Sequence, residues 1–338
     1  MQMDVQDVTF QGIAKRIMQI LAAINLRPNY LPPVRQRINE AYFSDQWRGN
    51  DCFAHYSRHQ FEFFSVVGET VHSFLEMLDL VRFDIERVPT SKLDERNKLL
   101  MCMLWLKSYN TFVQLALMFD VSITDVSRII HATWPVLLRV FGAYIRWPTP
   151  AQWLSMKGNW PSLPGVVGAI DATSHEIYTP GHDFRSYYSG HRKFQCVHTQ
   201  IIVDNDNNIR YVYSGIQGKE NDAKSYRNLP TLGPKGTTLY LPDDCWILAD
   251  GIYPAEEPLV KSFRKNQMAL HDPEENYRRV LYNQEHSSHR VYVEHVVGSF
   301  KNFRVISTLY RHHRSVISRV VTLCAALAQR RVDLFDNI

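Results

Sequence analysis

The spacing of apolar residues changes near the middle of the chain, and this change limits the folds that the sequence can adopt. From about residue 61 to residue 141 apolar residues recur every three or four positions, the period of amphipathic helices. The segment 147–150 (WPTP) then interrupts the pattern with two prolines. After residue 164 the apolar residues form short runs rich in β-branched and aromatic side chains, as in strands. The chain has 338 residues, a length typical of about two domains. The change of pattern predicts a helical region at 1–150 and a mixed α/β domain at 151–338.

The beginning of the chain also follows the helical period. Isoleucine and leucine recur at three- and four-residue steps between residues 13 and 24, which predicts an amphipathic helix. Residues 27–35 (RPNYLPPVR) contain three prolines and therefore predict a connector that cannot continue this helix.

Four short runs predict the strands of the second domain. Residues 165–170 (GVVGAI) and 246–249 (WILA) are continuous apolar runs that suit strands buried on both faces. The runs 194–203 and 209–213 flank the turn-forming residues DNDNN and predict a hairpin. A helical period returns after Arg290, so we expect helices to pack around these strands.

Two of the predicted strands are followed directly by an aspartate, Asp171 and Asp250. Open α/β sheets build their sites at the carboxyl ends of strands, and two neighbouring strands would bring both carboxylates close to one ion. Magnesium prefers oxygen ligands and is commonly held by one or two carboxylates. Glu294, on the predicted helix, and Asp222, after the hairpin, are further candidate ligands. A single aspartate after a strand is more often a turn residue or a helix cap, so the spacing alone leaves both interpretations open.

Other acids and histidines are weaker candidates for a site. Four aspartates lie in turn-forming segments and are expected to have local roles: Asp204, Asp206, Asp243 and Asp244. His286, His289 and His295 lie near Glu294 in the sequence. No matching pair of cysteines or histidines elsewhere completes a zinc site, so we expect these histidines at the surface or facing DNA.

Charge and composition exclude several classes of protein. The formal net charge of +4 is too small for a histone-like or polybasic protein. The five cysteines are scattered and form no C-x-x-C pair, which favours reduced thiols in an intracellular compartment over a disulfide framework or a zinc finger. The apolar run 99–106 ends at Lys107, far short of the roughly 20 residues that span a bilayer. Acidic Asp4 and Asp7 argue against a secretory signal peptide.

Residues 108–140 fit a helix-turn-helix. The first helix would end at Phe119, residues 120–122 would form the turn, and Ser122 or Thr124 would cap the second helix. The second helix would turn its apolar residues inward: Val126, Ile129, Ile130 and Trp134. Arg128 and His131 would then point outward, where they could contact a DNA major groove. Two amphipathic helices joined by a short turn are also a common packing unit, so this pattern alone does not establish DNA binding.

Two segments concentrate positive charge. Residues 301–331 contain seven lysines and arginines and no acid, whereas a solvated helix face usually mixes both signs. Arg185, Arg192 and Lys193 form a second basic cluster after the first strand. Both segments are expected to bind phosphates in a salt-dependent manner.

The second domain contains five motifs whose order along the chain is specific to one family of proteins. The motifs are GAIDAT (168–173), YYSGHRKFQCVHTQIIVD (187–204), GKENDAKSYRN (218–228), LADGIYP (248–254) and HSSHRVYVEHVVGSFKNFRVI (286–306). Together they resemble the PIF/Harbinger transposases of the DDE superfamily and their domesticated relatives, the Harbinger-derived nucleases. The resemblance covers about residues 163–327. It implies an α/β fold of the RNase H-like type, with a mixed sheet flanked by helices, preceded by an all-α helix-turn-helix domain.

The resemblance also implies roles for individual residues. Asp171, Asp250 and Glu294 match the three catalytic acids, and Asp222 matches a further family acid that serves as a metal ligand or supports one. Arg290 and Lys301 flank Glu294 and could contact phosphate, or could instead pair with the neighbouring acids. The DNA-binding residues expected on these grounds are Arg128, His131, Arg185, Arg192, Lys193, Arg290, Lys301, Arg304, Arg311 and Arg314.

Two positions depart from related patterns. Relatives in bacterial insertion sequences carry a tyrosine three residues before the arginine, whereas this chain has Ser287, as is common in Harbinger proteins. The segment between Asp250 and Glu294 is longer than expected, and its polar residues 272–279 predict a surface insertion.

The function implied is that of a DNA transposase. Such an enzyme cleaves double-stranded DNA at transposon ends and joins the 3′-OH to target DNA, using two Mg²⁺ or Mn²⁺ ions. The resemblance further implies a Myb/SANT-like accessory protein, a homodimer or higher oligomer on DNA, and action in the nucleus after import with that partner. The alternative is a domesticated, non-cutting DNA-binding or chromatin-associated protein derived from such a transposase.

Overall fold

The computed structural model describes residues 51–86, 93–233, 236–268 and 271–336. The helix predicted at 13–24 and the connector at 27–35 lie outside these ranges. No helix among the described residues is both long enough and apolar enough to cross a membrane. All five cysteines are described, and each is buried and free, as expected for a chain without a disulfide framework.

The first part of the described chain is a cluster of helices. Its helices are α3 (Cys52–Tyr56), α4 (Gln60–Val67), α5 (Val71–Glu86), α6 (Glu95–Lys107), α7 (Phe112–Phe119), α8 (Ile123–Phe141) and α9 (Pro150–Ser155). Thr111 and Thr149 form capping boxes that start α7 and α9. Helix α6 is buried on all sides between Arg96 and Leu106, so it forms the centre of this cluster.

The second part contains a mixed sheet with the order β2-β3-β1-β7-β8, and β4 also pairs with β3. The strands are β1 (Val166–Glu176), β2 (Tyr188–Ser189), β3 (Phe194–Asp204), β4 (Ile209–Gln217), β7 (Trp246–Ala249) and β8 (Leu259–Lys261). Strands β1, β3 and β4 are antiparallel neighbours, whereas β7 and β8 run parallel to β1. A separate pair is formed by β5 (Leu232–Gly233) and β6 (Leu239–Tyr240).

The hairpin predicted around residues 204–208 is confirmed as β3 and β4. Asp204 is fully buried in its turn, where it accepts hydrogen bonds from the backbone N–H groups of Asp206 and Asn208 and pairs with Arg210 at 2.6 Å. The predicted strands at 165–170 and 246–249 are confirmed as neighbouring parallel strands. Strand β1, however, continues six residues beyond the predicted end, because its second half keeps pairing with β3.

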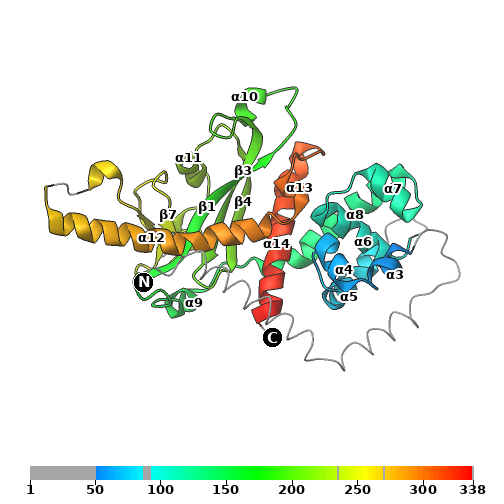
Figure 1. Cartoon of the computed structure of the whole chain (residues 1–338), viewed down its shortest axis with the longest axis horizontal. Coiled ribbons are helices and arrows are strands. Elements are labelled where there is room, and N and C mark those ends of the chain that lie inside the picture. Colours follow the sequence, from blue (N-terminus) through cyan, green and yellow to red (C-terminus); the bar gives the residue numbers. More distant parts are fainter. Residues whose placement is uncertain (1–50, 87–92, 234–235, 269–270, 337–338) are drawn as a thin grey trace, which may run out of the picture.

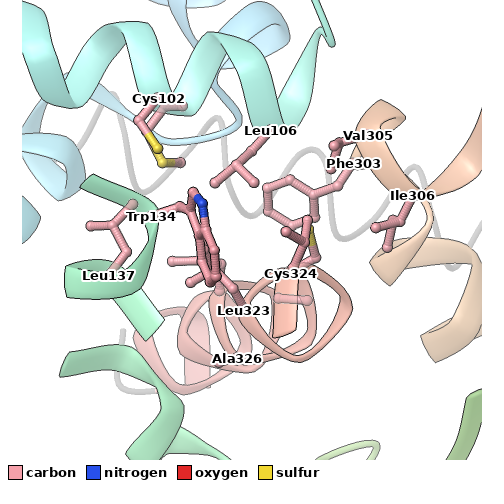
Figure 2. Close-up of a cluster of buried hydrophobic side chains, with 14 of the residues drawn as sticks. Cys102, Leu106, Trp134, Leu137, Phe303, Val305, Ile306, Leu323, Cys324 and Ala326 are labelled. Atoms are coloured by element: carbon pink, nitrogen blue, oxygen red, sulfur yellow. The ribbon is translucent and has the colours of Figure 1, made fainter. Parts of the chain in front are cut away.

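Three C-terminal helices connect the sheet to the helical cluster. Helix α12 (Pro273–Phe300) crosses one face of the sheet and extends past its edge, and α14 (Ile317–Asp336) lies between the sheet and the helical cluster (Figure 1). Figure 2 shows side chains from α6, α8, α13 (Arg304–Ser307) and α14 meeting in one apolar cluster. The two parts of the chain therefore share a continuous hydrophobic core.

Helix α12 differs from the sequence-based expectation. The helix was predicted to begin near Arg290, but it begins at Pro273, capped by the side chain of Asp272. Residues 272–279, expected as a surface insertion, form the start of this helix. Two ion pairs one turn apart support these polar turns: the exposed pair of Arg278 with Glu274 and the half-buried pair of Arg279 with Glu275.

A buried histidine links β1 to α13. His175 is 1% exposed, with Nδ1 2.8 Å from the Ile306 carbonyl oxygen and Nε2 3.0 Å from the Thr199 hydroxyl. Burial lowers the pKa of His175 to about 4, from an ordinary value of 6.5. The native protein therefore holds this imidazole neutral under conditions in which an unfolded chain takes up a proton.

We expect the free energy of unfolding to fall as the pH drops from about 6.5 to about 4. The unfolded state gains its proton at the upper end of this window and the native state only at the lower end, which amounts to a loss of up to about 3 kcal/mol. Urea denaturation of the wild type and of His175→Gln across this range tests the prediction. The variant should lose less stability on acidification, while His182→Gln, at an exposed position, should follow the wild type. Equal pH slopes for His175→Gln and the wild type would contradict it.

Candidate active site

Strands β1 and β7 bring Asp171 and Asp250 to the same region of the sheet. The last β1 residue that pairs with β7 is Ala169, opposite Leu248, so Asp171 lies just beyond the end of this pairing. Asp250 directly follows the last residue of β7. The Asp171 side chain lies on the α12 side of the sheet, because its register partner Ile201 packs in the core on that side. The flanking Ile170 packs in the core on the other side.

Helix α12 adds Glu294 to this region together with Arg290, one turn earlier on the same helix face. Arg290 lies between two acids. Its Nη1 is 3.4 Å from Oδ1 of Asp171, and its Nη2 is 2.6 Å from Oε1 of Glu294. Of the two roles that the sequence left open for Arg290, the structure shows pairing with the acids.

The charges in this region depend on one another. Burial raises the pKa of Asp171; Arg290 opposes that effect, and Glu294 adds to it. Burial alone would lower the pKa of Arg290, but the carboxylates of Asp171, Asp250 and Glu294 outweigh it and raise the pKa. All three acids predicted to be catalytic therefore act on the Arg290 guanidinium.

Asp222 lies apart from Arg290. It is the first residue of α11 (Asp222–Arg227), which Asn221 caps. Burial raises its pKa, His198 lowers it, and Asp250 raises it. The ring of His198 lies on the sheet face opposite Asp171, with Nε2 2.9 Å from the Gly218 carbonyl oxygen. Asp222 therefore lies near Asp250, and it approaches the site from the sheet face opposite Asp171.

Three further side chains lie around the acids, although the sequence analysis did not single them out: Tyr253, Gln200 and His198. The Tyr253 hydroxyl donates to Gln200 Oε1 at 2.6 Å, and both side chains are fully buried. Burial raises the pKa of Tyr253 well above its usual range, and Asp222 and Asp171 add to this effect. The D-G-x-Y spacing after β7 was the one signal that could have identified Tyr253.

Among the described residues, no group of three or more His, Cys, Asp or Glu side chains is arranged to hold a metal ion. The chemistry of the donors nevertheless suits a hard divalent cation, because every candidate ligand is a carboxylate. In this structure the Arg290 guanidinium supplies the positive charge between Asp171 and Glu294. A cation held jointly by Asp171 and Glu294 would compete with this guanidinium.

The three histidines near Glu294 do not form a zinc site in the described part of the chain. His286 is buried, with Nε2 3.3 Å from the Val260 carbonyl oxygen, and His289 packs against the buried Trp160. Only His295 is exposed. The prediction that all three lie at the surface is therefore wrong for His286, which packs against the strand β8.

The predicted phosphate-binding residues fall into two groups. Arg185, Arg192, Lys193 and Arg304 are exposed. Three others have internal partners: Lys301 Nζ donates to the Ser174 carbonyl oxygen at 3.3 Å, Arg311 stacks on Tyr109 at 3.9 Å, and Arg314 stacks on Tyr187 at 4.9 Å. The basic stretch 301–331 is therefore only partly available to a ligand.

The helix-turn-helix has the predicted geometry. The side chain of Ser122 accepts a hydrogen bond from the Asp125 N–H at the start of α8, and Asp120 takes a left-handed conformation in the turn. The four predicted inward residues are buried: Val126, Ile129, Ile130 and Trp134. Arg128 and His131 are exposed; Arg128 lies 3.8 Å from Asp125, and His131 contacts the rings of Phe112 and His312.

Two family models match the chain. Residues 170–329 match the family described as DDE superfamily endonuclease, and this segment contains all four candidate acids. Residues 91–141 match the family described as helix-turn-helix of DDE superfamily endonuclease, and this segment contains α6, α7 and α8. No curated protein and no solved structure matches the chain. The chain thus contains a segment similar to DDE superfamily endonucleases, preceded by a segment similar to the helix-turn-helix domain of such endonucleases.

Proposed function

We propose that the protein is a DDE transposase or transposase-derived endonuclease that cuts DNA with Asp171, Asp250 and Glu294. One observation carries the proposal: these acids, from β1, the end of β7 and α12, all act on Arg290 within the segment that matches a DDE endonuclease. Carboxylates brought together from three separate elements, within a partly buried region, are typical of a site and unusual for surface acids.

The finer assignment is to the PIF/Harbinger family and to an RNase H-like fold. The five sequence motifs support the family. The sheet supports the fold: its three long strands β1, β3 and β4 are antiparallel, and two short strands continue it in parallel on the other side of β1.

Asp171, Asp250 and Glu294 would hold divalent ions, with Asp222 as a further ligand or as support for Asp250. Bound Mg²⁺ or Mn²⁺ would supply the positive charge that activates an attacking oxygen and stabilises the leaving oxygen of a phosphodiester. Arg290, released from the acids, could then pair with a phosphate of the DNA strand. Strand transfer to target DNA, two ions per site, an accessory protein, assembly on DNA and action in the nucleus belong to the same proposal.

Cleavage of duplex DNA tests the proposal. The full chain should nick or cut DNA that carries the ends of its own element when Mg²⁺ or Mn²⁺ is present, and should be inactive with EDTA. A parallel assay includes a Myb/SANT-like partner, because such a partner is expected to help the protein recognise the element ends. Tight DNA binding without cutting under all these conditions would favour the non-cutting alternative, in which Arg290 permanently neutralises the acids.

Arg290→Gln should increase the affinity of the site for Mn²⁺ about tenfold or more. A monovalent and a divalent cation about 5 Å apart repel each other by about 1.7 kcal/mol even at the dielectric constant of water, which corresponds to more than tenfold in binding. Titration calorimetry of the full chain measures this affinity without any DNA. Arg278→Gln is the matched control, because Arg278 pairs with Glu274 at the exposed start of the same helix. Unchanged or weaker Mn²⁺ binding in Arg290→Gln would contradict the proposal that a divalent ion takes the place of Arg290 beside the acids.

A further inference from the structure

A buried histidine joins three segments of the chain on the sheet face opposite Asp171. His198 lies on β3 opposite Ser174 of β1, and only 7% of it is exposed. The Ser174 hydroxyl lies 2.9 Å from Nδ1 of the ring, and the Gly218 carbonyl oxygen lies 2.9 Å from Nε2. The ring therefore connects β1 and β3 to the segment that follows β4 and leads into α11.

These two contacts determine which ring nitrogen carries the proton. Burial lowers the pKa of His198 below its ordinary value of 6.5, so the imidazole is neutral at pH 7 and has one N–H. Because a carbonyl oxygen can only accept, this N–H lies on Nε2 and donates to Gly218. Nδ1 then accepts from the Ser174 hydroxyl. Both ring nitrogens are used, which holds the ring in one orientation.

The backbone at Gly218 is packed too closely for a side chain. An added Cβ would collide with the carbonyl oxygens of Tyr187 and Cys196. The next residue is held as well, because the Lys219 N–H donates to the Ser186 carbonyl oxygen at 3.1 Å. The segment after β4 therefore starts from a fixed point against β3 and the residues that precede β2.

A series of hydrogen bonds continues from this fixed point to Asp222. The Glu220 N–H donates to the Gln217 carbonyl oxygen at 3.0 Å and closes a turn. The Asn221 side chain then accepts from the Lys224 N–H at 2.8 Å and caps α11. Asp222 is the first residue of this helix, which packs on β3 (Figure 1). The turn and the cap therefore set the backbone position of Asp222.

The Asp222 carboxylate depends on this backbone for its own position. Its side chain forms no hydrogen bond or ion pair with any other residue that the structure describes. The residue is half-buried, and Asp250 lies close enough to raise its pKa. Two neighbouring carboxylates of which one has both oxygens free are suited to sharing a hard cation. A movement of residues 218–221 would therefore remove this candidate ligand from Asp250.

We propose that His198 is a positioning residue that holds Asp222 beside Asp250, so that the two carboxylates can bind one divalent ion. It acts through the Gly218 carbonyl oxygen and residues 218–221, without contacting the ion itself. This inference rests on the proposed function, because it takes Asp222 as a metal ligand of the site.

Two substitutions separate the two hydrogen bonds of the ring. The side-chain amide of glutamine reaches the position of Nε2 and keeps a donor for Gly218, whereas that of asparagine reaches only the position of Nδ1. His198→Asn therefore leaves the Gly218 carbonyl oxygen buried without its donor, and His198→Gln does not. His175→Asn is the matched control, because His175 is a buried, hydrogen-bonded histidine on the other face of the sheet.

Hydrogen–deuterium exchange of the full chain tests the anchor without metal or DNA. Four amides that follow Gly218 are hydrogen-bonded in the native structure: those of Lys219, Glu220, Lys224 and Ser225. They should exchange about tenfold faster in His198→Asn than in the wild type. In His198→Gln and His175→Asn they should stay within about threefold of the wild type. Circular dichroism and thermal unfolding verify that each variant is folded.

Titration calorimetry with Mn²⁺ tests whether the anchor acts through Asp222. His198→Asn should weaken Mn²⁺ binding by the full chain about tenfold, as expected for a residue that supports a metal ligand. His198→Gln and His175→Asn should stay within about threefold of the wild type. In the Asp222→Asn background His198→Asn should weaken binding by less than about twofold, because a positioning residue has no effect once its ligand is gone.

Two results would overturn the inference: amides that exchange in His198→Asn as slowly as in the wild type, or a loss of Mn²⁺ affinity that is equally large with and without Asp222. Either result, in a wild type that binds Mn²⁺ and cuts DNA, removes the role of His198 and leaves the proposed function intact. A wild type that neither binds Mn²⁺ nor cuts DNA removes the proposed function, and the positioning role with it.

Discussion

Arg330→Met should lower the free energy of unfolding by about 3–5 kcal/mol, the usual result of removing one partner from a buried ion pair. Arg330 and Glu69 are each 2% exposed, and Arg330 Nη1 lies 3.0 Å from Glu69 Oε2. Arg330 also donates to the Ser73 hydroxyl at 2.7 Å and to the Ser73 carbonyl oxygen at 3.1 Å. The substitution leaves the Glu69 carboxylate buried, with Arg331 at 3.1 Å as its remaining charged partner and the Ser73 hydroxyl as a hydrogen-bond donor at 2.5 Å.

Denaturation in urea measures this effect. Arg319→Met is the matched control, because Arg319 is an exposed arginine on the same helix, and it should change stability by less than about 0.5 kcal/mol. A loss below about 1 kcal/mol in Arg330→Met would show that the ion pair does not hold α14 against the segment that precedes α5. Because α14 also packs on β4 and α8, we expect the sheet and the helical cluster to unfold together in the variant.

This ion pair illustrates what the sequence could not provide. The acid-free stretch 301–331 predicts a surface for phosphate, and Arg304 has the exposed position that this prediction requires. Arg330 and Arg331 instead neutralise Glu69, which is more than 250 residues away in the chain. A local count of charges cannot identify a partner that only the tertiary fold brings close.

Local signals predicted other features well. The cap Ser122 and the inward residues of α8 follow from spacing within a few turns, and the neighbouring β1 and β7 follow from two apolar runs that each end in an aspartate. The early start of α12 was missed because its first turns are polar and have no apolar face. The pairing of Arg290 with Asp171 across 119 residues was one of two alternatives, and only the packing of α12 on β1 decided it.

Asp171→Asn should reduce DNA cleavage at least about a thousandfold, the scale expected when one member of a catalytic group is removed. The amide is the same size as the carboxylate but carries no charge, so it binds a divalent cation poorly. Asp250→Asn and Glu294→Gln should give losses of the same order. Rates of nicking at saturating Mg²⁺ measure the effect, and Asp244→Asn is the control, because Asp244 is an exposed turn residue that pairs with Lys157 at 3.6 Å.

DNA binding and stability should respond in the opposite direction to cleavage. Burial raises the pKa of Asp171, so the native fold disfavours its charged form, and the neutral amide removes that cost. Loss of a negative charge near the DNA path should also leave DNA affinity unchanged or slightly higher. A folded Asp171→Asn protein that binds DNA and does not cut it would therefore assign this residue to the chemistry. Cleavage at the wild-type rate would remove Asp171 from the site, and the acids around Arg290 would then be a structural ion-pair network.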